Sequence, residues 1–396
     1  MRILVHDFGG YAFALQLSCA LARRGHTVSH AYCASLQTTP PGVSGAGALP
    51  ATLTVTGLKL SAPLNKYALV TRWRQERAFG RLVARHCQAF KPDIVLSGNA
   101  PLSAQAMLMR ACRRADIPFV YWLQDLLGVA TYRILRNKHT LLSETVGRYY
   151  RQLEGRLLRR SAAVVGITED FLPIVRARGA SEHRLTVIEN WANLDELPVR
   201  PKANAWAQAH GLADKTCLLY AGTLSMKHNP DLLLNLAHTL KDDATVRVVV
   251  ISQGIGMDYL QRRGGGLDNL ILMGYQPKQV LPDVLGAADV LLAVLEPDAG
   301  SFSVPSKVLT YLCAQRPVLL AVPPTNLAAR LVTHSRAGSV VAPDDAQGFA
   351  DAAALLARSA PMRAEMGSRA RAYAEATFDI TRIADRFLDV FAGVAK

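Results

Sequence analysis

Short, continuously apolar runs alternate with longer amphipathic segments along the whole chain. A run such as residues 246–251, apolar apart from Arg247, is typical of a strand with both faces covered, and apolar positions three or four residues apart between the runs predict helices. The alternation favours parallel sheets joined by crossover helices. The predicted fold class is therefore α/β, with two doubly wound, Rossmann-like domains. The predicted strands lie at residues 3–6, 27–29, 93–97, 119–122, 163–167, 217–221, 246–251, 270–273, 290–294 and 318–322. The main predicted helices lie at residues 11–24, 70–89, 101–115, 143–160, 229–241, 306–315, 346–357, 361–376 and 380–393.

The 396 residues are enough for two domains, and the pattern indicates where they meet. One α/β run ends near residue 190, and residues 189–201 read as a hinge. We expect an N-terminal domain over 1–190 and a C-terminal domain over 191–379, with residues 380–396 as a candidate segment of the first domain. Ligands of open α/β sheets bind at the carboxyl ends of the strands, so a cleft between two facing sheets is the expected site.

Composition excludes some classes of protein. No apolar run reaches the length of about 18 residues that indicates a membrane span, and the N-terminus lacks the apolar core of a signal peptide. The six cysteines are scattered without a C-x-x-C pair, which favours buried thiols over disulfides or a metal site. We therefore expect a protein of the reducing cytoplasm.

The positive charge lies entirely in the first half. Residues 1–190 hold 25 Lys and Arg against 11 Asp and Glu, whereas residues 191–396 hold 20 of each. Such a one-sided field suits an anionic partner, and basic residues interleaved with aromatics suit a lipid surface, although a solvated helix face is an equal alternative. No nucleic-acid recognition motif accompanies the charge. The candidate membrane or acceptor residues are Lys66, Arg72, Trp73, Arg74, Arg133, Arg136 and Lys138.

Two lysines at predicted strand ends point to phosphate binding. Pro305-Ser306-Lys307 opens a predicted helix, whose first free amides and Lys307 would attract an anion. Lys227 follows the strand at 217–221 within a Gly-containing loop. A single loop lysine is more often an exposed surface residue, but two at strand ends of one domain favour a function.

The first half carries weaker signals. Gly9-Gly10 lets a ligand approach the backbone, although a plain tight turn is the stronger alternative. This is no G-x-G-x-x-G fingerprint, which disfavours a nicotinamide cofactor. Asp125 follows the end of a strand. There its carboxylate could act as a base or orient an acceptor hydroxyl, and an N-cap role is equally well supported. His6 is more often a satisfied core residue than a catalyst.

Taken together, these segments resemble the GT-B glycosyltransferases of retaining family 4, in the branch that builds bacterial exopolysaccharide and O-antigen units (colanic-acid fucosyltransferase-like and N-acetylfucosaminyltransferase-like members). The resemblance covers the whole chain. It rests on Gly9-Gly10, Arg24-Gly25-His26, Lys91-Pro92-Asp93, Gln124-Asp125, Glu189-Asn190, Gly222-Thr223, Ala287-Ala288-Asp289, Pro305-Ser306-Lys307 and Arg316-Pro317.

The resemblance implies a retaining transfer from a nucleoside-diphosphate sugar, UDP slightly ahead of GDP, without a metal ion or other cofactor. The acceptor would be a lipid-linked (polyprenyl diphosphate) or saccharide molecule at the inner face of the cytoplasmic membrane. Asp125 and Lys227 would be the catalytic residues. Three positions depart from the family pattern: Thr223 replaces a frequent arginine, Thr310 a glutamate and Gln315 a glycine. A non-catalytic subunit of a polysaccharide assembly complex is the alternative. The donor would be bound by Gly9, Gly10, Gly222, Thr223, Lys227, Tyr275, Ser303, Val304, Pro305, Ser306, Lys307 and Thr310.

Overall fold

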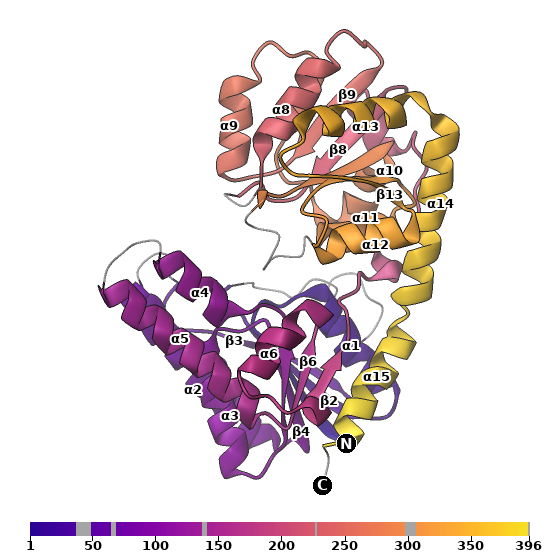
Figure 1. The fold of residues 1–396 in the computed structure, drawn as a ribbon. Coiled ribbons are helices and arrows are strands. Elements are labelled where there is room, and N and C mark those ends of the chain that lie inside the picture. Colours follow the sequence, from indigo (N-terminus) through magenta and orange to yellow (C-terminus); the bar gives the residue numbers. More distant parts are fainter. Residues whose placement is uncertain (37–48, 65–68, 137–140, 226–227, 298–305, 395–396) are drawn as a thin grey trace. The chain divides into compact units, whose positions relative to one another are not determined.

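The computed structural model describes residues 1–36, 49–64, 69–136, 141–225, 228–297 and 306–394. They form two compact units, which are Met1–Asn190 with Asp379–Lys396, and Trp191–Phe378. Each unit is a parallel sheet with helices on both faces (Figure 1). The predicted α/β class with two doubly wound domains is confirmed.

The sheet of the first unit reverses its strand order beside β1. Its order is β3-β2-β1-β4-β5-β6-β7 and all of its pairs are parallel. In register, Ile3 lies opposite Ile94 and Asp7 opposite Gly98. The loops that follow β1 and β4 therefore leave the sheet at the same level, at the switch point where open α/β sheets bind ligands. The strands are β1 (Arg2–Asp7), β2 (Thr27–Cys33), β3 (Leu53–Leu58), β4 (Ile94–Gly98), β5 (Phe119–Leu123), β6 (Ala163–Gly166) and β7 (Leu185–Val187).

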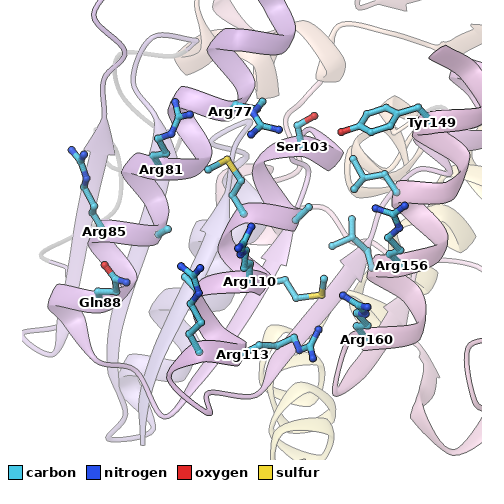
Figure 2. A pocket seen from close by; sticks show the side chains of 18 residues that line it. Arg77, Arg81, Arg85, Gln88, Ser103, Arg110, Arg113, Tyr149, Arg156 and Arg160 are labelled. Atoms are coloured by element: carbon cyan, nitrogen blue, oxygen red, sulfur yellow. The ribbon is translucent and has the colours of Figure 1, made fainter. Parts of the chain in front are cut away.

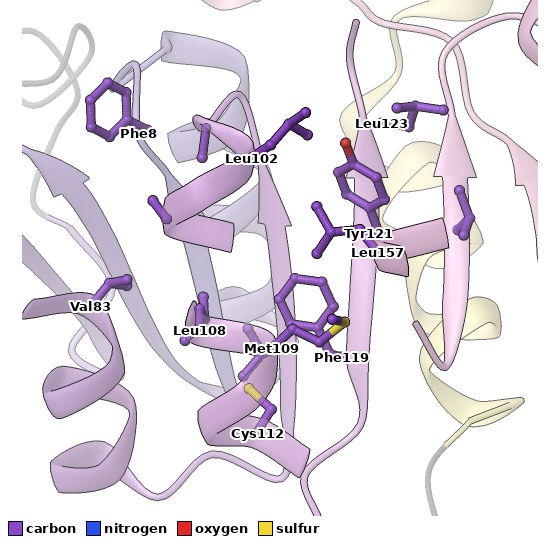
Figure 3. Close-up of a cluster of buried hydrophobic side chains, with 14 of the residues drawn as sticks. Phe8, Val83, Leu102, Leu108, Met109, Cys112, Phe119, Tyr121, Leu123 and Leu157 are labelled. Carbon is purple, nitrogen blue, oxygen red and sulfur yellow. The ribbon is translucent and has the colours of Figure 1, made fainter. Parts of the chain in front are cut away.

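Helices α2, α3 and α5 of the first unit share an apolar core with one face of this sheet. Val83, Leu108 and Leu157 contribute from these helices, and Phe119 and Tyr121 from β5 (Figure 3). The helices of the unit are α1 (Ala12–Arg23), α2 (Leu69–Phe90), α3 (Leu102–Arg114), α4 (Leu127–Arg136), α5 (Leu141–Arg160), α6 (Leu172–Ala177) and α15 (Ile380–Ala392).

Helix α15 belongs to the first unit although it follows the whole second unit in sequence. The Phe387 ring meets Trp122 of β5 edge-on, with 5.2 Å between ring centroids. The Arg24 guanidinium after α1 pairs with Asp385 at 2.9 Å and donates to the Thr381 carbonyl at 2.6 Å. The apolar face of α15 is thus covered within the unit.

The second unit repeats the design with the strand order β10-β9-β8-β11-β12-β13. Its switch point lies between β8 and β11. Apart from the half-buried Ala221, the apolar residues of β8, β9 and β11 are buried, as the apolar runs predict. The strands are β8 (Thr216–Ala221), β9 (Val246–Ile251), β10 (Leu270–Met273), β11 (Val290–Val294), β12 (Val318–Ala321) and β13 (Gly338–Val341). The helices are α7 (Ala205–Ala209), α8 (Pro230–Thr239), α9 (Ile255–Arg263), α10 (Leu281–Gly286), α11 (Lys307–Cys313), α12 (Leu327–Ser335), α13 (Ala346–Arg358) and α14 (Ala360–Thr377).

The sequence pattern missed three strands and two helices, of which α7 (Ala205–Ala209) is only five residues long. β3, β7 and β13 are edge strands, and every residue of β7 and β13 is only half-buried. These three strands lack the continuous apolar run that marks a central strand, and that is also present in the predicted edge strand β10. Helix α4 (Leu127–Arg136) was missed although its apolar residues recur at a helical period, because its tyrosine and basic residues had been interpreted as a surface set.

The six cysteines are all buried free thiols. Among the described residues, no helix combines the length and the apolar character that crossing a bilayer requires.

Helix α11 ends before the predicted residue 315, and the reason is a left-handed residue. It spans Lys307–Cys313, and Gln315 has a φ of 57°. This conformation strains any residue with a Cβ and favours glycine just beyond a helix end. It accounts for the glycine that the resembling family carries at this position.

Replacing Gln315 with glycine is therefore expected to stabilise the second unit by about 1 kcal/mol, because the left-handed strain is relieved. Thermal unfolding measures this as a rise in Tm of about 2–4 °C. The same change at Gln347, on the regular helix α13, should lower the Tm instead. A lower Tm for Gln315→Gly would contradict the assignment of strain.

Candidate functional site

Lys307, the first residue of α11, places its ammonium at the carboxyl end of β8. Its Nζ lies 3.5 Å from the centroid of the Tyr220 ring, which favours a cation over its face. A Cβ added to Gly222 would stand 3.0 Å from the same nitrogen, and Gly222 has a φ of 133°. Glycine therefore leaves the room that the ammonium occupies. The result is a held positive charge beside a backbone turn, an arrangement that suits a bound anion.

The loops after β8, β9 and β10 are tied together beside this charge. The Leu224 amide donates to the Ser252 Oγ at 3.0 Å, and the Leu224 carbonyl accepts from the Gly256 amide at 3.1 Å. The hydroxyls of Thr223 and Tyr275 share a short hydrogen bond. Thr223 and Tyr275, both predicted donor-site residues, are thus in contact.

Two tyrosines that sequence reasoning missed fix the end of β8. The buried Tyr311 hydroxyl accepts from the Ala221 amide at 2.9 Å and donates to the Ala221 carbonyl at 3.0 Å. The Tyr220 hydroxyl donates to the Thr223 carbonyl at 2.9 Å. Burial raises the pKa of both phenols, so both stay neutral donors. The available signal was a phenol inside an apolar run, since a buried phenol needs a hydrogen-bond partner.

The remaining predicted donor residues of this unit are only partly covered by the structure. Ser306 is exposed directly before α11, and Thr310 is half-buried one turn after Lys307. Lys227, Ser303, Val304 and Pro305 lie outside the described residues.

In the first unit, Asp7 organises the turn after β1. Its buried carboxylate accepts a hydrogen bond from the Tyr11 amide. A Cβ on Gly9 would come within 2.1 Å of the Tyr11 ring, and Gly10 has a φ of 65°. Each glycine is thus required by the local geometry, as a tight turn demands. Burial raises the pKa of Asp7 to about 7, and the amides of Tyr11, Gly9 and Gly10 offset only part of that rise.

This raised pKa predicts a pH effect for Asp7→Asn. Below about pH 4 the carboxyl is protonated in both the folded and the unfolded protein. Between pH 4 and about pH 7 the unfolded state releases the proton while the folded state keeps it, so the wild type loses stability as the pH rises. Asparagine avoids this loss. Chemical denaturation measures the free energy of unfolding of Asp7→Asn minus that of the wild type. This difference should be more positive at pH 8 than at pH 4 by at least about 1.4 kcal/mol, the equivalent of one pKa unit. A pH-independent difference would contradict it.

His6 is a neutral core residue. Its Nδ1 lies 2.9 Å from the Ser97 Oγ, and its ring stacks on Phe79. Burial, with smaller effects from His30 and His86, lowers the pKa of His6 to about 3. An imidazole that stays uncharged inside the sheet agrees with the sequence-based interpretation of His6 as a core residue rather than a catalyst.

Asp125 is exposed after β5, beside an amide pair that was not predicted. Gln124 and Asn190 exchange two hydrogen bonds through their side chains, at 3.1 and 2.6 Å. Gln124 is nearly buried, so the pair holds the segment after β7 to the end of β5. Asp125 is thereby presented at the carboxyl edge of the first sheet.

The predicted basic and aromatic set is divided by the structure. Arg72 pairs with the buried Glu76 at 3.0 Å, and Trp73 is half-buried under the Arg77 guanidinium, 4.8 Å from its ring centroid. Arg74 is exposed. Lys66 and Lys138, and the side chains of Arg133 and Arg136, lie outside the described part.

Comparison with known families matches each half of the chain. Residues 8–191 match the glycosyl transferase 4-like domain, and residues 215–359 match glycosyl transferases group 1. No curated protein sequence matches the chain.

Solved structures share the fold at low identity. HepE from Anabaena, in complex with UDP-glucose, has a TM-score of 0.70 and 18% identity, with 99% of both chains covered. Sucrose-phosphate synthase from Thermosynechococcus elongatus has a TM-score of 0.71 and 16% identity, over 99% of this chain and 98% of that one. A glycosyltransferase from Rickettsia africae has a TM-score of 0.67 and 12% identity, over 100% and 98%.

The two domain matches and the shared fold agree with the arrangement of two doubly wound sheets. The chain therefore belongs to the glycosyltransferases of the GT-B fold, with a glycosyl transferase 4-like domain followed by a group 1 domain.

Proposed function

We propose that the protein transfers a sugar, with retention of configuration, from a nucleoside-diphosphate sugar to a lipid-linked (polyprenyl diphosphate) or saccharide acceptor in bacterial polysaccharide biosynthesis. The observation that carries the proposal is the Lys307 ammonium, held between Gly222 and Tyr220 at the carboxyl end of β8. UDP is favoured over GDP, and HepE in complex with UDP or UDP-glucose supports this choice.

In the proposed reaction, the bond between the anomeric carbon and the diphosphate oxygen breaks, the acceptor oxygen bonds to that carbon, and the acceptor's proton passes to the leaving diphosphate. Negative charge collects on the leaving diphosphate, where fixed positive groups stabilise the transition state most. Lys307 and Lys227 supply that charge, so the proposal needs no metal ion. Asp125 orients the acceptor hydroxyl. The donor is bound by Gly9, Gly10, Gly222, Thr223, Tyr275, Ser303, Val304, Pro305, Ser306 and Thr310.

Thermal unfolding with UDP, GDP, ADP and dTDP tests the donor assignment. A nucleotide at 100 times its Kd stabilises the protein by about 2.7 kcal/mol. We expect the largest rise in Tm with UDP. No rise with any of the four would overturn the assignment.

We further propose peripheral attachment to the inner face of the cytoplasmic membrane through Lys66, Arg72, Trp73, Arg74, Arg133, Arg136 and Lys138. Each basic residue near an anionic surface contributes about 1 kcal/mol. The protein should therefore float with phosphatidylglycerol vesicles at low salt and separate from them at high salt, as the charges are screened. Binding that ignores salt, or no binding, removes this part of the proposal.

A non-catalytic, glycosyltransferase-like subunit is the second candidate. It is favoured by Thr223, whose hydroxyl is engaged with Tyr275 at a position where the resembling family often has an arginine. Slow hydrolysis of the UDP-sugar without an acceptor separates the two functions, because an enzyme releases UDP and a binding subunit does not.

A further inference from the structure

Helices α2, α3 and α5 of the first unit line a groove of about 880 Å³. Arginines from all three helices project along it (Figure 2). Its volume lies within the range of about 300–1,000 Å³ that is common for ligand sites. Eight arginines line the groove, namely Arg77, Arg81, Arg85, Arg110, Arg113, Arg114, Arg156 and Arg160.

The positive charge of the groove is not neutralised by neighbouring acids. Helix α3 contains no acidic residue. The acids of α2 and α5 are engaged elsewhere: Glu76 with Arg72 at 3.0 Å, Glu144 with Arg148 at 2.6 Å, and Glu154 with Arg178 at 3.2 Å. Among the described residues, none of the eight arginines forms a salt bridge. The groove therefore attracts a ligand with several negative charges.

Most arginines of the groove lie on the C-terminal halves of these helices, away from the proposed transfer site, although the groove also reaches Ser103 in the first turn of α3. Helices α2, α3 and α5 end at Phe90, Arg114 and Arg160, and short connections then lead to the first residues of β4, β5 and β6. The C-terminal ends of these helices thus lie at the amino edge of the sheet, whereas ligand sites of such folds lie at the carboxyl edge. Cations also stabilise helix C-termini, which explains arginines in the last turn such as Arg113 and Arg160. Arg81 and Arg156 lie before the last turn and are not explained in this way.

The groove combines this charge with apolar surface. Ala84, Ala106 and Met107 line it between the arginines, and Tyr149, with 38% of its surface exposed, lies at its rim. Arginine forks bind carboxylates and phosphates in pairs of hydrogen bonds. Single-stranded nucleic acid stacks on several aromatics, whereas this groove has one. A flat bilayer reaches protruding side chains rather than the walls of a groove.

We propose that the groove binds a linear glycan that carries repeated carboxylate or phosphate groups, and so holds an anionic saccharide chain away from the transfer site. The choice of a glycan over another polyanion rests on the proposed function. Carboxylated and phosphorylated glycans share a chain of sugar rings. The apolar faces of the rings would contact Ala84, Ala106 and Met107, and the anionic groups would contact the arginines.

Isothermal titration calorimetry of the full chain tests the proposal with defined probes. The probes are a short oligogalacturonate (carboxylates), a phosphorylated mannan oligosaccharide (phosphates), and a neutral maltodextrin of the same length. We expect one anionic glycan per chain, binding that weakens with salt, and no binding of the maltodextrin. The triple variant Arg81→Gln/Arg110→Gln/Arg156→Gln should weaken binding at least tenfold.

A matched variant separates the groove from net charge. Arg23→Gln/Arg262→Gln/Arg358→Gln removes three charges from exposed positions outside the groove and should change affinity less than twofold. An equal loss of glycan affinity in both triple variants would overturn the proposal. Tighter binding of phosphatidylglycerol vesicles or of an oligothymidylate than of both anionic glycans would also overturn it. The rise in Tm with UDP is measured on every variant. It reports on folding and on the donor site, so failure of the groove and failure of the proposed function give different results.

Discussion

Replacing Lys307 with alanine is expected to lower the rate of sugar transfer by about tenfold to a hundredfold. A charge-assisted hydrogen bond to a phosphate contributes about 1.5–3 kcal/mol, and each 1.36 kcal/mol is a factor of ten in rate. The Lys307 Nζ is already positioned by Tyr220 and Gly222, so its charge is fixed before the diphosphate leaves. Steady-state kinetics with UDP-glucose as a trial donor should place most of the loss in kcat.

Lys278→Ala is the matched control for this variant. Lys278 lies in the same unit and pairs with Glu196 at 2.6 Å, and both side chains are partly exposed. Its removal eliminates the same charge and should leave transfer nearly unchanged. Near-normal turnover of both Lys307→Ala and Lys227→Ala would contradict the assignment of the diphosphate site to this edge of the sheet.

Replacing Glu154 with alanine is expected to destabilise the first unit by about 3–5 kcal/mol, the usual cost of breaking a buried ion pair from one side. The Glu154 carboxylate is fully buried on α5. It accepts from the Gly128 amide in the first turn of α4 at 2.9 Å and pairs with Arg178 at 3.2 Å. Burial raises its pKa, with the Gly128 amide and Arg178 opposing that rise. Its loss leaves both partners uncompensated. Thermal unfolding should record a fall in Tm of more than about 5 °C.

Glu144→Ala provides the comparison on the same helix. Glu144 and Arg148 form an exposed pair one turn apart, which contributes about 0.3–0.5 kcal/mol. If the two alanine variants unfolded at the same temperature, Glu154 would not hold α4 and Arg178 to α5.

The central strands were predictable because burial on both faces leaves a direct mark in the sequence. Val246–Ile251 is apolar apart from Arg247, and it is β9. The missed edge strands β3, β7 and β13 carry a mixed pattern that a single sequence does not separate from a loop, whereas the edge strand β10 is continuously apolar and was predicted. The same limit explains the end of α11. The φ of 57° at Gln315 is a backbone property, and no neighbouring residue announces it.

Several residues that carry the family resemblance have structural tasks. The Arg316 guanidinium donates to the carbonyls of Ala288 and Gly286, both at 2.7 Å. Asp289 accepts from the Cys217 amide at 2.9 Å and pairs with Lys202 at 2.8 Å. Such residues identify the fold, because they join its loops and strands. They carry no information on the nucleotide or the acceptor, so the substrates could not be derived from them.

The sequence predicted which residues lie at the donor site, but not all of the contacts that they make with one another. Thr223 and Tyr275 were both expected at the donor, and their hydroxyls are in contact. The contact between Tyr220 and Lys307 was not predicted, because in the sequence Tyr220 is one more apolar residue of β8. Only the folded chain brings that ring under Lys307.

The position of α15 has a consequence for the order in which the protein is made. The first unit needs Phe387 beside Trp122 and Asp385 beside Arg24, yet residues 191–378 of the second unit lie between these partners in the chain. During synthesis the ribosome completes the second unit before the first can close. The second unit is thus an insertion that can be excised as one continuous fragment, whereas the first can be expressed alone only if residues 379–396 are joined back to residue 190 by a linker.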